Sequence, residues 1–111
     1  MSGRVELWLY VAQRLSAMVL APLVIIHIAT MVYAIRDGLT AAEILSRTDG
    51  SIFWACFYGL FVVAAAVHGA IGLRAILREM TAWRSKSLDV AAGAFCLTIL
   101  VLGLRAVEAV T

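Results

Sequence analysis

The chain has 111 residues, of which 64% are hydrophobic and only 14% are charged, and its formal net charge is +2. Because these few polar groups cannot cover the surface of a soluble domain of this size, the composition predicts one integral membrane domain over residues 1–111. The small and dispersed positive charge gives no indication of nucleic-acid binding, and we expect no such partner.

The first ten residues form a short amphipathic segment with side chains suited to a membrane interface, namely Arg4, Glu6, Trp8 and Tyr10. No charge occurs between Arg14 and Arg36. These limits lie about 33 Å apart on a helix, which is enough to cross the hydrocarbon core. We therefore expect a retained first span over about residues 12–35, kinked at Pro22, rather than a cleaved signal peptide.

The segment 39–49 is polar and predicts a short surface helix. Thr40 is placed to cap its N-terminus, with Glu43 three residues later as the capping-box partner. A second uncharged run follows and predicts a span over about residues 52–77. The charged connection after it includes Trp83, a residue type that anchors helices at the membrane interface.

The third uncharged run, residues 90–104, is short, about 22 Å as a helix. Either Asp89 and Arg105 extend toward the interface, or the helix continues toward Val110. We expect a third span over about residues 88–107. The predicted fold class is all-α, with three transmembrane helices and a short interfacial helix between the first two.

The distribution of basic residues predicts the orientation. Six lie at the end of the spans that carries the N-terminus, and three lie at the other end. The six are Arg4, Arg14, Arg74, Arg78, Arg84 and Lys86, and the three are Arg36, Arg47 and Arg105. Since basic residues concentrate on the inner side of a membrane, the N-terminus is expected inside and the C-terminus outside.

Both histidines, His27 and His68, lie inside predicted spans, where an ionisable residue marks a candidate functional site. The side of the helix that carries His68 has only small residues near it, Ala64, Ala65, Gly72 and Ala75, as a flat macrocycle would require. The uncharged runs contain no Asp or Glu for a proton path. Haem ligation and a hydrogen bond within the helix packing remain as interpretations of each histidine.

The two histidines differ in expected depth. From the helical rise, His27 lies about 20 Å from the inner edge of the membrane and His68 about 9 to 15 Å. The axial ligands of one upright haem should lie at similar depths. The mismatch of about 5 to 11 Å therefore favours a separate haem for each histidine over one shared haem.

A second candidate site is the run Gln13-Arg14-Leu15-Ser16. Arg14 is either an anchor that extends to the interface or, together with Ser16, a hydrogen-bond donor to a quinone carbonyl or a haem propionate. On the helix of His68, Arg74 lies about 240° around the axis from the histidine and Arg78 about 80°. Both are candidates for a propionate, and Arg78 is the better aimed.

These residues resemble those of a known family. Gln13-Arg14-Leu15-Ser16-Ala17 is similar to the Arg-x-Ser/Thr-Gly/Ala signature of the small membrane-anchor subunits of succinate:quinone oxidoreductases. His68-x-x-x-Gly72-Leu73-Arg74 resembles their second-span haem motif, His-x-x-x-Gly-Ile/Leu-Arg. The resemblance covers nearly the whole chain. It implies the cytochrome b anchor subunit of a succinate dehydrogenase or fumarate reductase (complex II).

The resemblance implies that His68 is an axial ligand of haem b, and that Arg14 and Ser16 line the quinone site or meet a propionate. It also implies a flavoprotein and an iron–sulfur protein as partners, in the cell inner membrane or the mitochondrial inner membrane. A histidine in the first span is typical of the two-haem branch, which makes His27 a ligand of a second haem.

Two departures from the family pattern leave open which of the paired anchor subunits this chain is. Many relatives have histidine at the position of Gln13 and glycine at that of Ala17. Three spans alone cannot enclose both haem and quinone, so we expect a second anchor subunit or another copy of this chain.

The predicted role is transfer of electrons between the iron–sulfur subunit and membrane quinone, assisted by haem b. The sequence has no flavin fingerprint, and Cys56 and Cys96 form no iron–sulfur cluster motif, so the dicarboxylate chemistry belongs to the partners. The alternative from another class is a small cofactor-free transporter or assembly subunit.

Overall fold

The computed structural model describes residues 3–111, which form four helices and no strand. They are α1 (Gly3–Asp37), α2 (Ala41–Thr48), α3 (Ile52–Met80) and α4 (Lys86–Val110). The three long helices are each long and apolar enough to cross a membrane. The predicted all-α class, with a short helix between the first two long ones, is confirmed.

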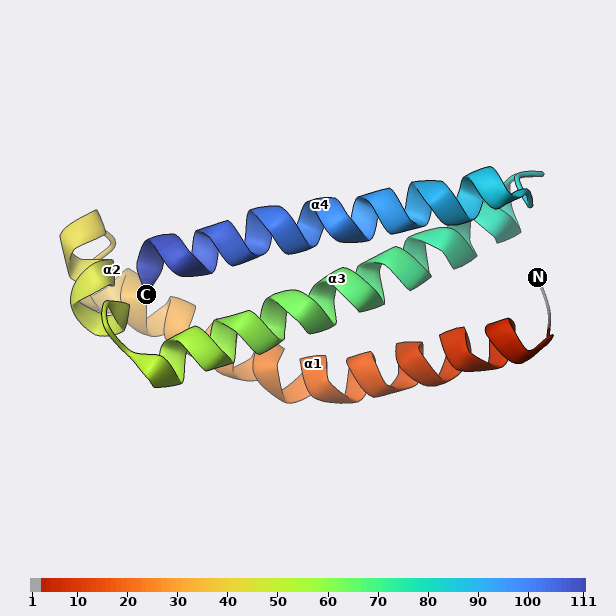
Figure 1. The fold of residues 1–111 in the computed structure, drawn as a ribbon. Coiled ribbons are helices and arrows are strands. Elements are labelled where there is room, and N and C mark those ends of the chain that lie inside the picture. The colour runs from red at the N-terminus through yellow and green to blue at the C-terminus, as the bar shows by residue number, and fades with distance from the viewer. Residues whose placement is uncertain (1–2) are drawn as a thin grey trace.

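The central element of the bundle is α3, which packs against both other long helices. Figure 1 shows α1 and α4 on opposite sides of it. The described residues extend over 49 × 24 × 22 Å along their principal axes, and the three long helices run along the longest of these. This length is close to the thickness of a bilayer with its headgroups, about 40 to 45 Å.

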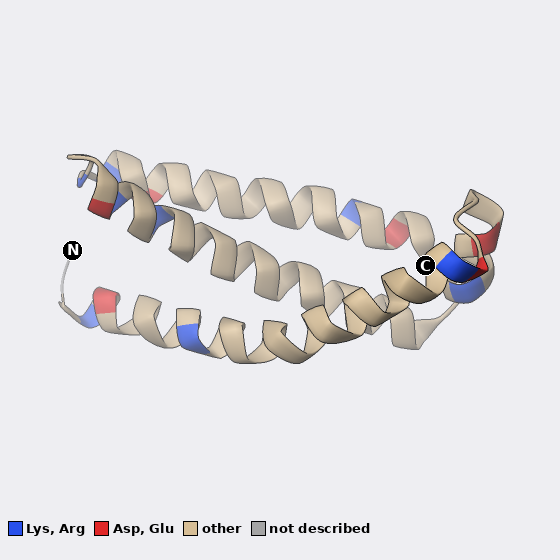
Figure 2. Ribbon diagram, turned by 180° about the vertical axis from the view of Figure 1, so that it is seen from behind, with Lys and Arg blue, Asp and Glu red and all other residues tan. Residues whose placement is uncertain are grey.

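The first long helix, α1, continues through Pro22 without a break. Proline has no N–H to donate, which frees the carbonyl oxygen of Met18 and bends a helix. Figure 2 shows that the axis of α1 changes direction part-way along its length, in agreement with the predicted kink. The helix also begins at Gly3, well before the expected span, so the amphipathic N-terminal segment is part of α1.

The turn between α1 and α2 depends on Gly38, whose φ of 143° is rarely adopted by other residues. A Cβ atom at this position would also overlap the carboxylate of Glu43. Thr40 caps α2 as predicted, because its hydroxyl oxygen accepts from the Glu43 N–H at 3.2 Å. The Thr40 hydroxyl in turn donates to the Glu43 carboxylate at 2.7 Å.

The third span follows the second of the two predicted alternatives, because α4 continues to Val110. Its C-terminal end is held by the connection between the other helices. The Thr48 hydroxyl donates to the Val110 carbonyl at 2.6 Å, and the Gly50 N–H donates to the Thr111 carbonyl at 3.0 Å. Close packing of α3 on α4 buries small side chains, Ala66 and Ala70 on α3 and Ala92 on α4.

Candidate functional site

The contact between α1 and α3 brings Ser16 and His68 together. Ser16 is buried, and its hydroxyl donates to the Gln13 carbonyl oxygen at 3.0 Å. The same hydroxyl oxygen lies 3.3 Å from Nδ1 of His68. Because the Ser16 proton is directed at Gln13, its oxygen is available to accept from Nδ1–H of His68. This assignment leaves Nε2 of the neutral ring with a free lone pair.

A histidine with Nδ1–H hydrogen-bonded and Nε2 free has the arrangement found in most metal-ligating histidines. The described residues contain no group of three or more His, Cys, Asp or Glu side chains that could hold a bare metal ion. Haem iron has a different requirement, since the macrocycle supplies four ligands and the protein one or two. His68 meets this requirement through Nε2.

The small-residue strip around His68 is partly covered by α1. Ala64 is buried, and a Cβ atom added to Gly72 would lie 3.5 Å from Nε2 of Gln13. Part of the strip therefore lets α1 approach α3 closely, as the alternative interpretation of the sequence allowed. His68 itself remains half-buried.

His27 lies in the same contact between α1 and α3 but at another level. Its ring centroid is 5.2 Å from that of Phe61 and 5.9 Å from that of Tyr58, both in edge-on arrangements. His68 is level with Ser16, which is eleven residues from His27 on α1, or about 16 Å along a helix. On α3, His68 lies seven residues from Phe61 and ten from Tyr58, or about 10 to 15 Å along that helix. Neither separation fits one upright haem held by both histidines.

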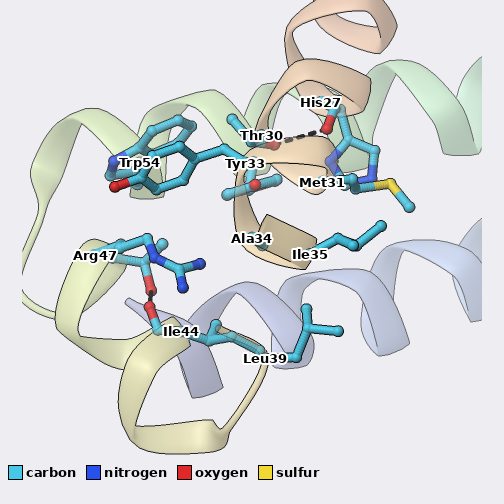
Figure 3. A pocket seen from close by; sticks show the side chains of 12 residues that line it. His27, Thr30, Met31, Tyr33, Ala34, Ile35, Leu39, Ile44, Arg47 and Trp54 are labelled. Carbon is cyan, nitrogen blue, oxygen red and sulfur yellow. Dashed lines mark hydrogen bonds between the residues drawn. The ribbon is translucent and has the colours of Figure 1, made fainter. Parts of the chain in front are cut away.

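Beside His27 lies a pocket of about 650 Å³, between α1, α2 and the start of α3. Figure 3 shows the side chains that line it, among them Tyr33, Arg47 and Trp54. Nδ1 of His27 is enclosed and has no hydrogen-bond partner among the described residues. A buried polar atom without a partner is costly, and a bound group or a turn of the ring would remove that cost.

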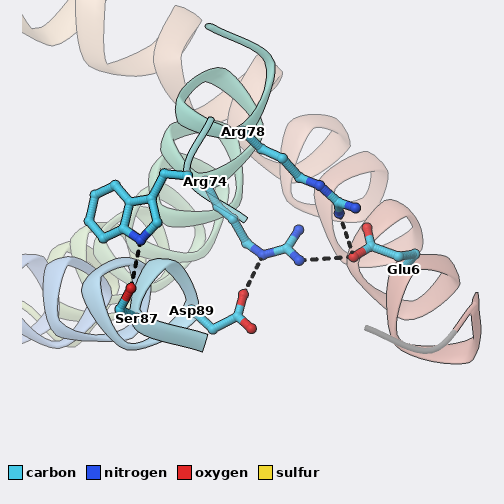
Figure 4. A network of polar contacts seen from close by, with 6 residues as sticks. Glu6, Arg74, Arg78, Ser87 and Asp89 are labelled. Atoms are coloured by element: carbon cyan, nitrogen blue, oxygen red, sulfur yellow. Dashed lines mark hydrogen bonds and ion pairs between the residues drawn. The ribbon is translucent and has the colours of Figure 1, made fainter. Parts of the chain in front are cut away.

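Arg74 is buried and joins all three long helices, as Figure 4 shows. Its Nη2 lies 2.8 Å from Oε1 of Glu6 on α1, and its Nε lies 2.7 Å from Oδ1 of Asp89 on α4. Arg78 binds the same Glu6 oxygen at 2.9 Å. From the sequence, both arginines were expected to be candidates for binding a haem propionate. In the structure, both are paired with carboxylates.

Glu6 and Asp89 were not predicted as functional residues. The available signal was their position at the end of the bundle that carries Arg74 and Arg78, since Asp89 directly precedes the third uncharged run and Glu6 lies eight residues before Arg14. An acidic residue at that level is a partner for a buried arginine, because an unpaired charge there would be costly.

Arg14 and Ser16 are not brought together. Two residues along a helix correspond to about 200° of rotation, so the buried Ser16 faces α3 and Arg14 faces away. The Arg14 guanidinium lies 5.9 Å from the ring centroid of Tyr10 and is exposed. Arg14 is therefore free to meet the interface or a group on the outer surface of the bundle.

The chain matches a known protein family. The family model described as "Succinate dehydrogenase/Fumarate reductase transmembrane subunit" matches residues 1–103. No curated protein and no solved structure matches the chain.

Proposed function

The chain belongs to the succinate dehydrogenase/fumarate reductase transmembrane subunit family, and from this premise we propose that it is a haem b subunit that passes electrons between an iron–sulfur partner and membrane quinone. The family accounts for membrane attachment. The observation that carries the finer proposal is the hydrogen bond at His68, whose Nδ1 is engaged by Ser16 at 3.3 Å while Nε2 is left free.

In this proposal, Nε2 of His68 would hold the iron of haem b. The bound haem would supply a one-electron redox centre. Ser16 fixes the orientation and tautomer of the His68 ring, and by accepting a hydrogen bond from Nδ1–H it increases electron donation from the imidazole. A second ligand would come from a second anchor subunit or another copy of this chain, since His27 lies at a different level.

We assign His27 to a second haem nearer the other end of the bundle. The adjoining pocket of about 650 Å³ supports a bound group at this position. The His27 ring would turn to present a nitrogen to that group, since Nδ1 is enclosed and unpartnered as the ring stands. The level difference along α1 also supports separate sites. The two haem ligands are then both held between α1 and α3, at two depths in the membrane.

We place quinone at the end of the bundle that carries Arg14. Its exposed guanidinium is suited to a planar oxygen acceptor, either a quinone carbonyl or a haem propionate. Ser16 remains a candidate for a quinone carbonyl only from its own, buried side of α1. With the N-terminus inside, this end faces the flavoprotein and iron–sulfur partners, in a cell inner membrane or mitochondrial inner membrane.

The test is a spectrum of the assembled complex, purified with its partners. Reduction by succinate or by quinol should give the absorbance bands of haem b in the wild-type complex. His68→Ala should lose at least part of them, while Cys96→Ser, a conservative change at a half-buried position on α4, should keep them. A wild-type complex without b-type absorbance would support the alternative, a cofactor-free transporter or assembly subunit.

A further inference from the structure

Glu6 forms the polar connection between the N-terminal part of α1 and α3. Its Oε1 atom accepts from Nη2 of Arg74 at 2.8 Å and from Nη1 of Arg78 at 2.9 Å. Charge-assisted hydrogen bonds of this kind are short and about twice as strong as neutral ones. The Arg74 side chain is 10% exposed, so its loss of hydration increases the importance of its two carboxylate partners.

The two polar contacts between α1 and α3 have the same register. Glu6 lies ten residues before Ser16 on α1, and its partners Arg74 and Arg78 lie six and ten residues after His68 on the antiparallel α3. The contact at Glu6 and the contact at Ser16 are therefore about 15 Å apart on α1 and about 9 to 15 Å apart on α3. A shift of α1 by one residue would rotate Ser16 by about 100° and remove it from His68.

We propose that Glu6 is a positioning residue for His68. Held by Arg74 and Arg78, it fixes α1 at the register in which the Ser16 oxygen accepts from Nδ1–H of His68. Through that hydrogen bond it sets the electron donation of the imidazole. This inference rests on the proposed function, because haem at His68 is its most sensitive readout.

Asp89 supplies a matched control. It binds Nε of the same Arg74 at 2.7 Å, but it lies on α4 rather than on α1. Asp89→Asn and Glu6→Gln each remove one carboxylate charge from the same guanidinium. Only Glu6→Gln weakens the attachment of α1, since Glu6 stays bound to both arginines when Asp89 is changed.

The first experiment is a double-mutant cycle on the midpoint potential of the His68 haem in the assembled complex. Ser16→Ala should shift the potential in the wild-type background and in the Asp89→Asn background. In the Glu6→Gln background the same change should produce less than half of that shift, because the hydrogen bond is already weakened. Equal shifts in all three backgrounds would overturn the proposal.

A second experiment needs no haem. Cysteines are introduced at Gln13 and Gly72, which face each other, in a chain with Cys56→Ser and Cys96→Ser. A short bismaleimide should cross-link them efficiently, and Glu6→Gln should reduce the yield by more than half, while Asp89→Asn should leave it unchanged. An unchanged yield in Glu6→Gln, or an equal loss in both variants, would overturn the positioning role. Absence of haem from the wild-type complex would instead contradict the proposed function and leave the cross-linking result valid.

Discussion

Among single residues, the hydroxyl group of Ser16 is central to the proposed haem site at His68. From the sequence, Ser16 was expected to contact a quinone carbonyl or a haem propionate. In the structure its oxygen lies 3.3 Å from Nδ1 of His68. The reason lies in the composition of α1. A helix that is apolar on all sides has no amphipathic stripe to show which face packs on its neighbour, so the direction of a small polar side chain is not readable from its spacing.

The residue-scale prediction concerns Ser16→Ala. Loss of the acceptor for Nδ1–H should make the imidazole a weaker electron donor, so the midpoint potential of the His68 haem should rise while the haem stays bound. The expected loss of free energy is that of one hydrogen bond, about 0.5 to 1.5 kcal/mol. Ser16→Thr keeps the hydroxyl and should stay near wild type in a spectroelectrochemical titration.

The same variants decide between the two roles of Ser16. A raised KM for quinone with an unchanged haem potential would assign the hydroxyl to quinone and contradict its contact with His68. Arg14→Leu provides the comparison, because the exposed guanidinium has no contact with His68 and should affect quinone kinetics alone.

At the scale of helices, charged residues made most of the fold predictable. They bound the three uncharged runs, which correspond to α1, α3 and α4, and Thr40 and Glu43 marked the start of α2. The pairing of Arg74 with Glu6 and Asp89 was not predictable in the same way. It depends on which helices are neighbours, and α3 lies between the other two only because of tertiary packing.

The element-scale prediction concerns the packing of α3 on α4. A Cβ atom at Gly103 would lie 2.5 Å from Cγ1 of Val62, so Gly103→Ala forces Val62 to rotate or the helices to separate. Such overpacking typically costs about 1 to 3 kcal/mol of unfolding free energy. Denaturant unfolding of the complex in micelles should show the loss.

Two further variants control this measurement. Gly93→Ala lies on the same helix with nothing within 4 Å of its added Cβ, and it should leave the unfolding free energy unchanged. Val62→Ala combined with Gly103→Ala should recover much of the loss, because it removes the opposing methyl groups. Equal destabilisation by Gly103→Ala and Gly93→Ala would contradict the described contact.

At the scale of the whole molecule, the chain is an open row of three long helices rather than a closed bundle, since α1 and α4 lie on opposite sides of α3 (Figure 1). Many large apolar side chains remain exposed along these helices, as expected for contact with lipid and with another subunit. The sequence predicted three long apolar helices, as the structure has them. It predicted different depths for the two histidines, but the distance between them along the helices depends on the register of α1 against α3.

Haem binding at the two histidines is best measured by a pyridine haemochrome count on the purified complex and its histidine variants. With one haem at each histidine, His68→Ala should lose the haem bound there and His27→Ala the other, so each should retain about half of the b-type haem assigned to this chain. A full haem complement in His27→Ala would reduce the proposal to one haem. A full complement in His68→Ala would contradict the assignment of haem b to His68.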